Sequence, residues 1–134
     1  MGQTSFIHPA QGVLFAEGIS LEAIAKEFGT PTYVYSKNTL IQTFESFKKG
    51  LLKTDHLICF AVKANSNIAI LNLFASLGAG FDIVSGGELE RVIYAGGDPQ
   101  KIVFSGVGKT ESEIVAALKA NILCFNVESR SELI

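Results

Sequence analysis

The sequence predicts an α/β fold in which about five parallel strands alternate with helices. Three observations favour this class. Short apolar runs recur along the chain, each run is followed by a segment with helical spacing of its apolar residues, and helix-start signals stand just after the runs. The expected strands are residues 32–35, 57–62, 81–84, 102–104 and 122–127. Strands joined through helices in this way pair in parallel.

Composition and charge exclude several classes of partner. The chain has 134 residues, enough for one domain with a buried core, and its net charge of −2 with no basic run argues against nucleic acid. The start of the chain is polar and residues 64–81 are interrupted by asparagine and glycine, so neither a secretion signal nor a membrane partner is expected. Cys59 and Cys124 lie in strand-like runs, which indicates reduced core thiols in a cytoplasmic protein. The two histidines lack ligand spacing, so no metal site is expected.

One strand and one helix are expected ahead of the alternating units. Residues 13–16 are apolar and predict a short strand that stands apart from the others. Ser20 has the character of an N-cap and Gly29 that of a C-terminal stop, so a helix is expected between them, through Phe28. Pro31 then separates this helix from the first strand of the alternating units.

Each later strand should be followed by a helix with one apolar stripe. The helix over about residues 36–53 has a stripe made of Leu40, Phe44, Phe47 and Leu51. A second helix is expected over residues 68–77. The inward-facing residues of the next two helices are expected to be Leu89, Val92 and Ile93, and then Ile114, Ala117 and Leu118.

Three helix starts share the pattern S/T-x-x-E, the capping box, in which the first and fourth residues cap each other's backbone N–H groups. The pairs are Ser85 and Glu88, Thr110 and Glu113, and Ser129 and Glu132. The third pair opens a helix that ends almost at once, and so short a helix is not stable alone. We therefore expect the sequence to be the N-terminal part of a longer protein.

The two faces of the expected strands differ in character. One face is bulky and apolar: Phe60, Val62, Phe81, Ile83, Ile102, Phe104, Leu123, Phe125 and Val127. The other starts small and becomes polar toward the C-terminal end of each strand: Cys59, Ala61, Lys63, Asp82, Val84, Val103, Ser105, Cys124, Asn126 and Glu128.

This asymmetry favours an incomplete (β/α)8 barrel of the TIM type. A doubly wound sheet carries helices on both faces, so both of its faces should be apolar. A barrel covers only its outer face with helices and keeps functional groups at the C-terminal ends of its strands. A complete barrel needs about 250 residues, so this chain would supply only part of one. A flavodoxin-like sheet of about five strands is the alternative fold.

Lys63 is the principal candidate for chemistry. Among the chain's lysines, it is the one that directly follows a strand expected in the core; the others have polar neighbours. A neutral amine placed there can attack a carbonyl and form a Schiff base. The alternative is a lysine at a strand end whose stem packs while its ammonium reaches solvent.

Four stretches together resemble diaminopimelate decarboxylases, which belong to the fold-type III pyridoxal-phosphate enzymes with an alanine-racemase-like barrel. The stretches are residues 33–35, 59–65, 80–89 and 102–106. The blocks AVKAN and FDIVSGGEL are specific in combination, and the resemblance runs from about Phe15 to the last residue. Ornithine decarboxylases are similar around Lys63, but residues 85–89 and 104–109 are more similar to the diaminopimelate branch.

The resemblance implies that Lys63 is the catalytic lysine that binds pyridoxal 5'-phosphate, and that Asp82 and Glu88 lie near it. A carboxylate at Asp82 would steady the lysine ammonium once substrate displaces it. Each acidic residue also has a simpler alternative role, an ion pair at the barrel rim for Asp82 and the helix cap for Glu88. Ser105 and Asn126 are weaker candidates, since barrel rims hold many polar side chains without a catalytic part.

The implied activity is conversion of meso-2,6-diaminopimelate to L-lysine and carbon dioxide by a homodimer. Residues 1–30 would lead toward a second, β-rich domain, and residues 31–134 would begin the cofactor-binding barrel. The family's cofactor-stacking histidine, glycine-rich phosphate loops and acidic partner of the pyridine nitrogen have no counterpart in these residues, so the chain alone is expected to be inactive. Two alternatives remain open: a racemase or ornithine- or arginine-type decarboxylase on the same barrel, and a non-catalytic flavodoxin-like binding module.

Overall fold

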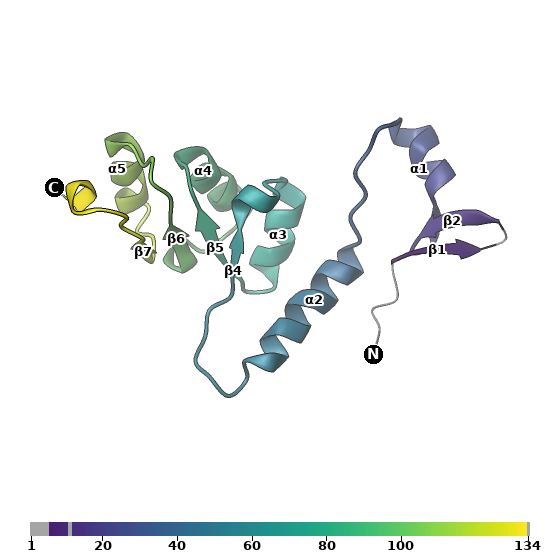
Figure 1. Cartoon of the computed structure of the whole chain (residues 1–134), viewed down its shortest axis with the longest axis horizontal. Coiled ribbons are helices and arrows are strands. Elements are labelled where there is room, and N and C mark those ends of the chain that lie inside the picture. The colour runs from purple at the N-terminus through teal and green to yellow at the C-terminus, as the bar shows by residue number, and fades with distance from the viewer. Residues whose placement is uncertain (1–5, 11, 134) are drawn as a thin grey trace. The chain divides into compact units, whose positions relative to one another are not determined.

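The computed structural model describes residues 6–10 and 12–133 (Figure 1). The chain divides into two compact units, Met1–Lys53 and Thr54–Ile134. In the described residues, the first unit holds an antiparallel sheet and two helices, and the second holds a parallel sheet with α-helices between its strands. The residues singled out as site candidates all belong to the second unit.

The first unit begins with an antiparallel sheet of β1 (Ile7–Ala10), β2 (Val13–Ala16) and β3 (Ile19–Ser20), in that order. The strand predicted at residues 13–16 is confirmed, and it lies apart from the parallel sheet, as the central strand of this antiparallel one. The sequence did not predict its neighbours, because β1 contains a histidine and a proline and β3 has only two residues. Neither one shows a recognisable run of alternating apolar residues.

Helix α1 (Leu21–Phe28) confirms the predicted helix and both of its end signals. The hydroxyl of Ser20 accepts a hydrogen bond from the backbone N–H of Ala23 at 3.2 Å. Gly29 has φ 78°, a left-handed conformation that glycine adopts without the steric cost a Cβ would add. A hydroxyl cap at the start and a glycine at the end therefore define this helix.

In the first unit one predicted strand is wrong and one predicted helix is wrong in part. Residues 32–35 lie in a loop and pair with no strand among the described residues, and a segment without a paired neighbour is not a strand. Helix α2 runs over Lys37–Gly50 and ends before residue 53. Phe44 of its predicted stripe is buried, but Phe47 is 66% exposed.

The second unit contains a parallel sheet of four strands, where the sequence predicted about five. The strands are β4 (Cys59–Ala61), β5 (Gly80–Ile83), β6 (Ile102–Phe104) and β7 (Cys124–Phe125). The α-helices between them are α3 (Ile68–Ser76), α4 (Gly86–Tyr94) and α5 (Glu111–Lys119). Short 3₁₀ helices follow β4, precede β6 and close the described chain: η1 (Val62–Ala64), η2 (Pro99–Lys101) and η3 (Arg130–Leu133).

The strand order separates the two folds that the sequence left open. The strands lie in the order β4-β5-β6-β7, so each strand pairs with the next one along the chain. A flavodoxin-like sheet reverses its strand order at a switch point, whereas a barrel adds each new strand on the same side. The second unit is therefore a segment of a (β/α) barrel.

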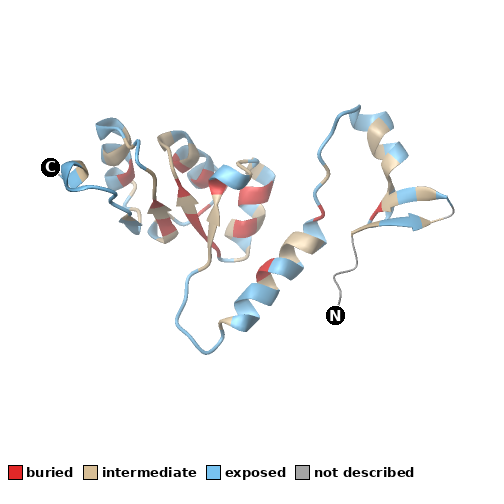
Figure 2. Cartoon of the chain, in the orientation of Figure 1, coloured by how far each residue is buried: buried red, intermediate tan, exposed pale blue. Residues whose placement is uncertain are grey.

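Burial confirms the predicted asymmetry of the sheet (Figure 2). The core is made of fully buried side chains from alternate strand positions and from all three helices: Val62, Phe81, Ile83, Ile102, Phe104, Leu71, Val92 and Ala117. The intervening positions Asp82, Val103 and Ser105 are only half-buried. Burying a Phe- or Leu-sized side chain contributes about 1.5–3 kcal/mol, so the helix-covered face holds this unit together.

Several residues predicted to face the core are exposed instead: Ile93 at 43%, Leu118 at 62%, Leu123 at 52% and Val127 at 42%. The buried positions are Leu89 and Val92 on α4 and Ala117 on α5, and the residue that follows Val92 or Ala117 lies about 100° further round the helix. The two residues near β7 are exposed because β7 is the last strand of the sheet, and no further described helix covers it.

Candidate functional site

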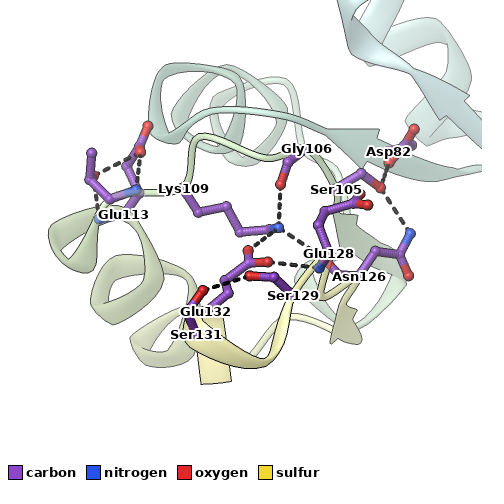
Figure 3. Close-up of polar contacts among 11 residues, drawn as sticks. Asp82, Ser105, Gly106, Lys109, Glu113, Asn126, Glu128, Ser129, Ser131 and Glu132 are labelled. Carbon is purple, nitrogen blue, oxygen red and sulfur yellow. Dashed lines mark hydrogen bonds and ion pairs between the residues drawn. The ribbon is translucent and has the colours of Figure 1, made fainter. Parts of the chain in front are cut away.

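A row of hydrogen-bonded polar side chains crosses the C-terminal ends of β5, β6 and β7 (Figure 3). The hydroxyl of Ser105 donates to Asp82 Oδ1 at 2.5 Å, and Asn126 Nδ2 donates to the Ser105 hydroxyl at 3.0 Å. We call these three residues the rim row. All three were candidates from the sequence, and the structure brings them into direct contact.

The sheet register explains why the rim row forms. Asp82 pairs with Val103, so it lies on the half-buried face of β5 near the strand end. The backbone N–H groups of Ser105 and Asn126 continue the ladders, donating to the carbonyls of Ile83 and Phe104 at 2.8 and 2.9 Å. Parallel strands end at one edge of the sheet, so polar residues placed just after each strand meet there.

Lys63 lies next to this row in the sheet. It belongs to η1, which starts where β4 ends, and Ala61 of β4 pairs with Asp82 of β5. Val62 beside it is fully buried, whereas Lys63 is exposed and its ammonium makes no hydrogen bond or ion pair with any residue of the described ranges. The lysine is therefore exposed just after the end of β4, and the neighbouring strand β5 carries the Asp82 carboxylate.

Glu88 is committed to the backbone at the end of β5. Its Oε2 accepts a hydrogen bond from the Val84 N–H at 2.7 Å, and its own N–H donates to the Ser85 hydroxyl at 3.3 Å. The capping box predicted here is therefore half-formed, because the carboxylate reaches one residue further back than the cap. No hydrogen bond within the described residues joins Glu88 to the rim row.

The other two predicted boxes also have different outcomes. Thr110 and Glu113 form the complete reciprocal box at the start of α5. Ser129 and Glu132 do not, because the Glu132 carboxylate accepts from the Glu128 N–H at 2.7 Å. Glu132 and Glu88 therefore share one geometry, in which the carboxylate accepts from the N–H of the residue four positions earlier in the chain.

Glu113 also joins the starts of two helices at this edge. Its Oε1 accepts from the N–H of Gly86, the first residue of α4, at 2.7 Å. This bond, with those from the Thr110 N–H and hydroxyl, lowers the pKa of Glu113 to about 2 from the ordinary 4.5. Because the folded pKa is depressed, the contribution to stability is present above pH 4.5 and is lost as the pH falls toward 2.

Replacing Glu113 with glutamine should therefore remove part of the acid dependence of stability. We expect the free energy of unfolding of this chain to fall less steeply between pH 4.5 and pH 2 in Glu113→Gln than in the parent. Urea titrations at a series of pH values measure this slope. Glu111→Gln is the matched control on the same helix turn, and equal slopes in both variants and the parent would refute the role of Glu113.

The buried lysine of the unit is Lys109, which the sequence did not single out. Its side chain is 1% exposed and its ammonium donates to the carbonyls of Gly106 and Asn126 at 2.6 and 2.8 Å, and to Glu132 Oε1 at 2.6 Å (Figure 3). The hydrogen bond from Lys109, and then that from the Glu128 N–H, lower the pKa of Glu132. Its neighbours in the sequence are polar and predicted a solvated charge, and this prediction is wrong because the side chain is buried.

The cysteines differ from one another. Burial raises the pKa of the Cys59 thiol, and the charges of Asp82 and Cys124 raise it further, so the thiol stays protonated at neutral pH. Cys124 is exposed, and the prediction of a core thiol is wrong there because β7 is an edge strand.

The fold and the site together define a segment of a (β/α) barrel that carries a lysine and a polar row at the C-terminal ends of its strands. Residues 37–134 match the family model described as the pyridoxal-binding domain of pyridoxal-dependent decarboxylases, and the chain belongs to this family. The resemblance found in the sequence is confirmed. None of the helices in the described residues is long and apolar enough to span a membrane.

Similar proteins fall mainly in one branch of this family. The chain is 60% identical over 122 residues to the diaminopimelate decarboxylase of Pseudomonas fluorescens, covering 91% of this chain and 29% of that protein. It is 57% identical over 128 residues to the Vibrio cholerae diaminopimelate decarboxylase, covering 96% and 31%. The chain therefore spans about a third of the length of these relatives.

Solved structures confirm the fold. AQ1208 from Aquifex aeolicus superposes with a TM-score of 0.91 at 52% identity, over 96% of this chain and 32% of that one. The diaminopimelate decarboxylase from M. jannaschii, in complex with L-lysine, superposes with a TM-score of 0.88 at 40% identity, over 95% and 31%.

The residues at this edge fit the cofactor that the family's name implies, pyridoxal phosphate. A primary amine is needed to bind its aldehyde, and Lys63 presents an exposed one at the end of β4. A carboxylate follows on the adjacent strand, at Asp82, and is itself held by the Ser105 hydroxyl. This edge of the sheet therefore offers an amine that could bind the aldehyde and, on the next strand, a hydrogen-bonded carboxylate.

Proposed function

We propose that this chain supplies the lysine-bearing part of the cofactor-binding barrel in an enzyme that decarboxylates meso-2,6-diaminopimelate to L-lysine. The observation that carries the proposal is the exposed Lys63 amine at the C-terminal end of β4, one strand from the Asp82 carboxylate. The choice of substrate is supported by relatives that are 60% and 57% identical and are diaminopimelate decarboxylases.

Lys63 would hold pyridoxal phosphate through its amine and would be freed when the substrate is bound. When bound, the cofactor supplies an electron sink for the electron pair released as the carbon–carboxylate bond breaks. Lys63, once freed, stands at the reacting centre with an amine that can accept or donate a proton. Its position at a strand end gives it a rigid support close to the exposed edge.

Asp82 would keep the freed Lys63 in its charged form. A carboxylate near an ammonium favours the protonated amine, and Asp82 lies on the strand next to that of Lys63. Ser105 donates to Oδ1 of this carboxylate, which fixes its orientation and leaves Oδ2 for other partners. Ser105 and Asn126 would therefore act by orienting Asp82.

Glu88 would contribute to the cofactor site through the free side of its carboxylate. Oε2 is used by the Val84 N–H, at the end of the same strand that carries Asp82. This bond fixes the carboxylate at the C-terminal edge of the sheet, where the cofactor is expected.

The whole enzyme would be a cytoplasmic homodimer that acts on a small amino acid and binds neither nucleic acid nor membranes. A barrel of eight units needs about 250 residues, and the chain supplies four paired strands. Residues 1–134 by themselves would therefore be inactive, because the open half of the barrel would leave the cofactor site incomplete.

A chimera tests this proposal. Residues 1–134 would replace the matching N-terminal segment of the Vibrio cholerae diaminopimelate decarboxylase, which is 57% identical. We expect this Vibrio chimera to release both carbon dioxide and lysine from diaminopimelate, and to act poorly on ornithine and arginine. A soluble, folded chimera that racemises amino acids or decarboxylates only ornithine or arginine would overturn the proposed substrate.

A further inference from the structure

The buried ammonium of Lys109 is hydrogen-bonded to three residues and can hold them in place. An ammonium has three hydrogens to donate, and here each has an acceptor: the carbonyl of Gly106, the carbonyl of Asn126 and Glu132 Oε1. We call Lys109 and these three acceptors the clamp. The lysine side chain is 1% exposed, and Nζ lies 5.8 Å from the centre of the Phe104 ring, within the range of a cation–π contact. Such a buried charge is tolerated only when fully paired.

Two of the three acceptors of Lys109, the carbonyls, lie just after the two strands β6 and β7, where Ser105 and Asn126 of the rim row also lie. Gly106 directly follows Ser105, and the second carbonyl belongs to Asn126 itself. One ammonium therefore binds the backbone of Asn126 and of the residue after Ser105, and the side chains of Ser105 and Asn126 meet at 3.0 Å. Figure 3 shows Lys109 reaching between these two strand ends.

Glu132 completes the clamp from the far side. It binds Lys109 through Oε1 and the Glu128 N–H through Oε2, so the segment that follows β7 is fixed to the same ammonium. Glu132 is itself only 15% exposed, and removing the lysine would leave a nearly buried carboxylate and two carbonyls without their donor.

We propose that Lys109 is a positioning residue that clamps the ends of β6 and β7 so that Asn126, Ser105 and Asp82 form one row. It does not touch the reacting atoms; it sets the orientation of the Asp82 carboxylate beside Lys63. This inference rests on the proposed function for its effect on catalysis, but its structural part is independent of that function.

Lys109→Met in the Vibrio chimera tests the catalytic part. We expect kcat to fall by about ten- to a hundredfold, the range in which misplacement of a catalytic group by about 1 Å lies. The substrate KM and the cofactor absorbance should change little, because Lys63 is untouched. Lys119→Met removes an exposed lysine from α5 and is the matched control, with kcat unchanged.

A double-mutant cycle separates this role from a general loss of stability. Asn126→Ala breaks the row directly, and if Lys109 acts through the row, the double variant should lose no more activity than the more damaging single variant. Multiplicative losses would overturn the proposal, as would equal kcat values for Lys109→Met and Lys119→Met. If Lys109→Met does not fold, Glu132→Gln takes its place, since it keeps the lysine and removes only its charged partner.

Crystal structures of the variants provide a readout besides activity. The hydrogen bond from Asn126 Nδ2 to the Ser105 hydroxyl, 3.0 Å here, should be broken in Lys109→Met or in its Glu132→Gln substitute and intact in Lys119→Met. An intact hydrogen bond in the clamp variant overturns the proposal even if the chimera is inactive. The parent chimera could be inactive while the hydrogen bond between Asn126 and Ser105 is broken in Lys109→Met or Glu132→Gln. That result would contradict the proposed function and leave the positioning role of Lys109 supported.

Discussion

Lys63→Ala in the Vibrio chimera is expected to reduce kcat/KM for diaminopimelate by at least about a thousandfold. The substitution removes the amine that anchors the cofactor and also the group that moves a proton, and proton transfer by a positioned side chain alone contributes ~10²–10⁴. The visible absorbance of the bound cofactor should disappear with the activity. Steady-state kinetics and an absorption spectrum of the purified variant measure both effects.

Two further variants sharpen this result. Lys63→Arg keeps a positive charge at the end of β4 but cannot bind an aldehyde in the same way, so it should be as inactive as the alanine variant. Lys119→Ala, on the exposed side of α5, should leave both activity and spectrum unchanged. Substantial activity in either Lys63 variant would mean that another amine carries the cofactor.

Phe104→Ala should be the most damaging change to the stability of the second unit. Phe104 is fully buried, stacks on Phe125 with ring centres 5.8 Å apart, and lies under the ammonium of Lys109. Truncating a buried phenylalanine to alanine costs about 3–5 kcal/mol, and here the ring beneath the Lys109 ammonium is removed as well. Urea unfolding of this chain measures the change in unfolding free energy.

Leu118→Ala is the matched control for this prediction. The sequence placed Leu118 in the core, but the structure leaves it 62% exposed on α5. Its truncation should change the unfolding free energy by less than about 0.5 kcal/mol. A loss comparable to that of Phe104→Ala would contradict the burial pattern on which the fold is argued.

The alternation of strand and helix in the second unit could be predicted because each strand carries its own apolar signal. The apolar and the polar face of the parallel sheet could also be predicted, since Phe81 and Ile83 alternate with Asp82 in a period of two. The loop at residues 32–35 could not be predicted, because its residues have high strand propensity. Whether such a segment forms a strand depends on a paired neighbour, which the sequence does not show. The short strands β1 and β3 likewise depend on β2 and have little signal of their own.

Some residues of the site could be predicted from the sequence and others could not. Lys63, Asp82, Ser105 and Asn126 could be found because each lies within or directly after an apolar run. Lys109 could not be found, since its burial depends on three acceptors from residues 106, 126 and 132, which only the fold brings together. The sequence also could not show that the Glu88 carboxylate reaches past its expected cap to the Val84 N–H.

The central claim is that the cofactor is bound to one amine, that of Lys63. Borohydride reduction of the cofactor-loaded Vibrio chimera, followed by proteolysis and mass spectrometry, would locate the covalent link. We expect the pyridoxyl group on the peptide that contains Lys63 and on no other lysine of the chain. A modified Lys109 or Lys101, or a chimera that turns over substrate with Lys63 unmodified, would contradict the claim.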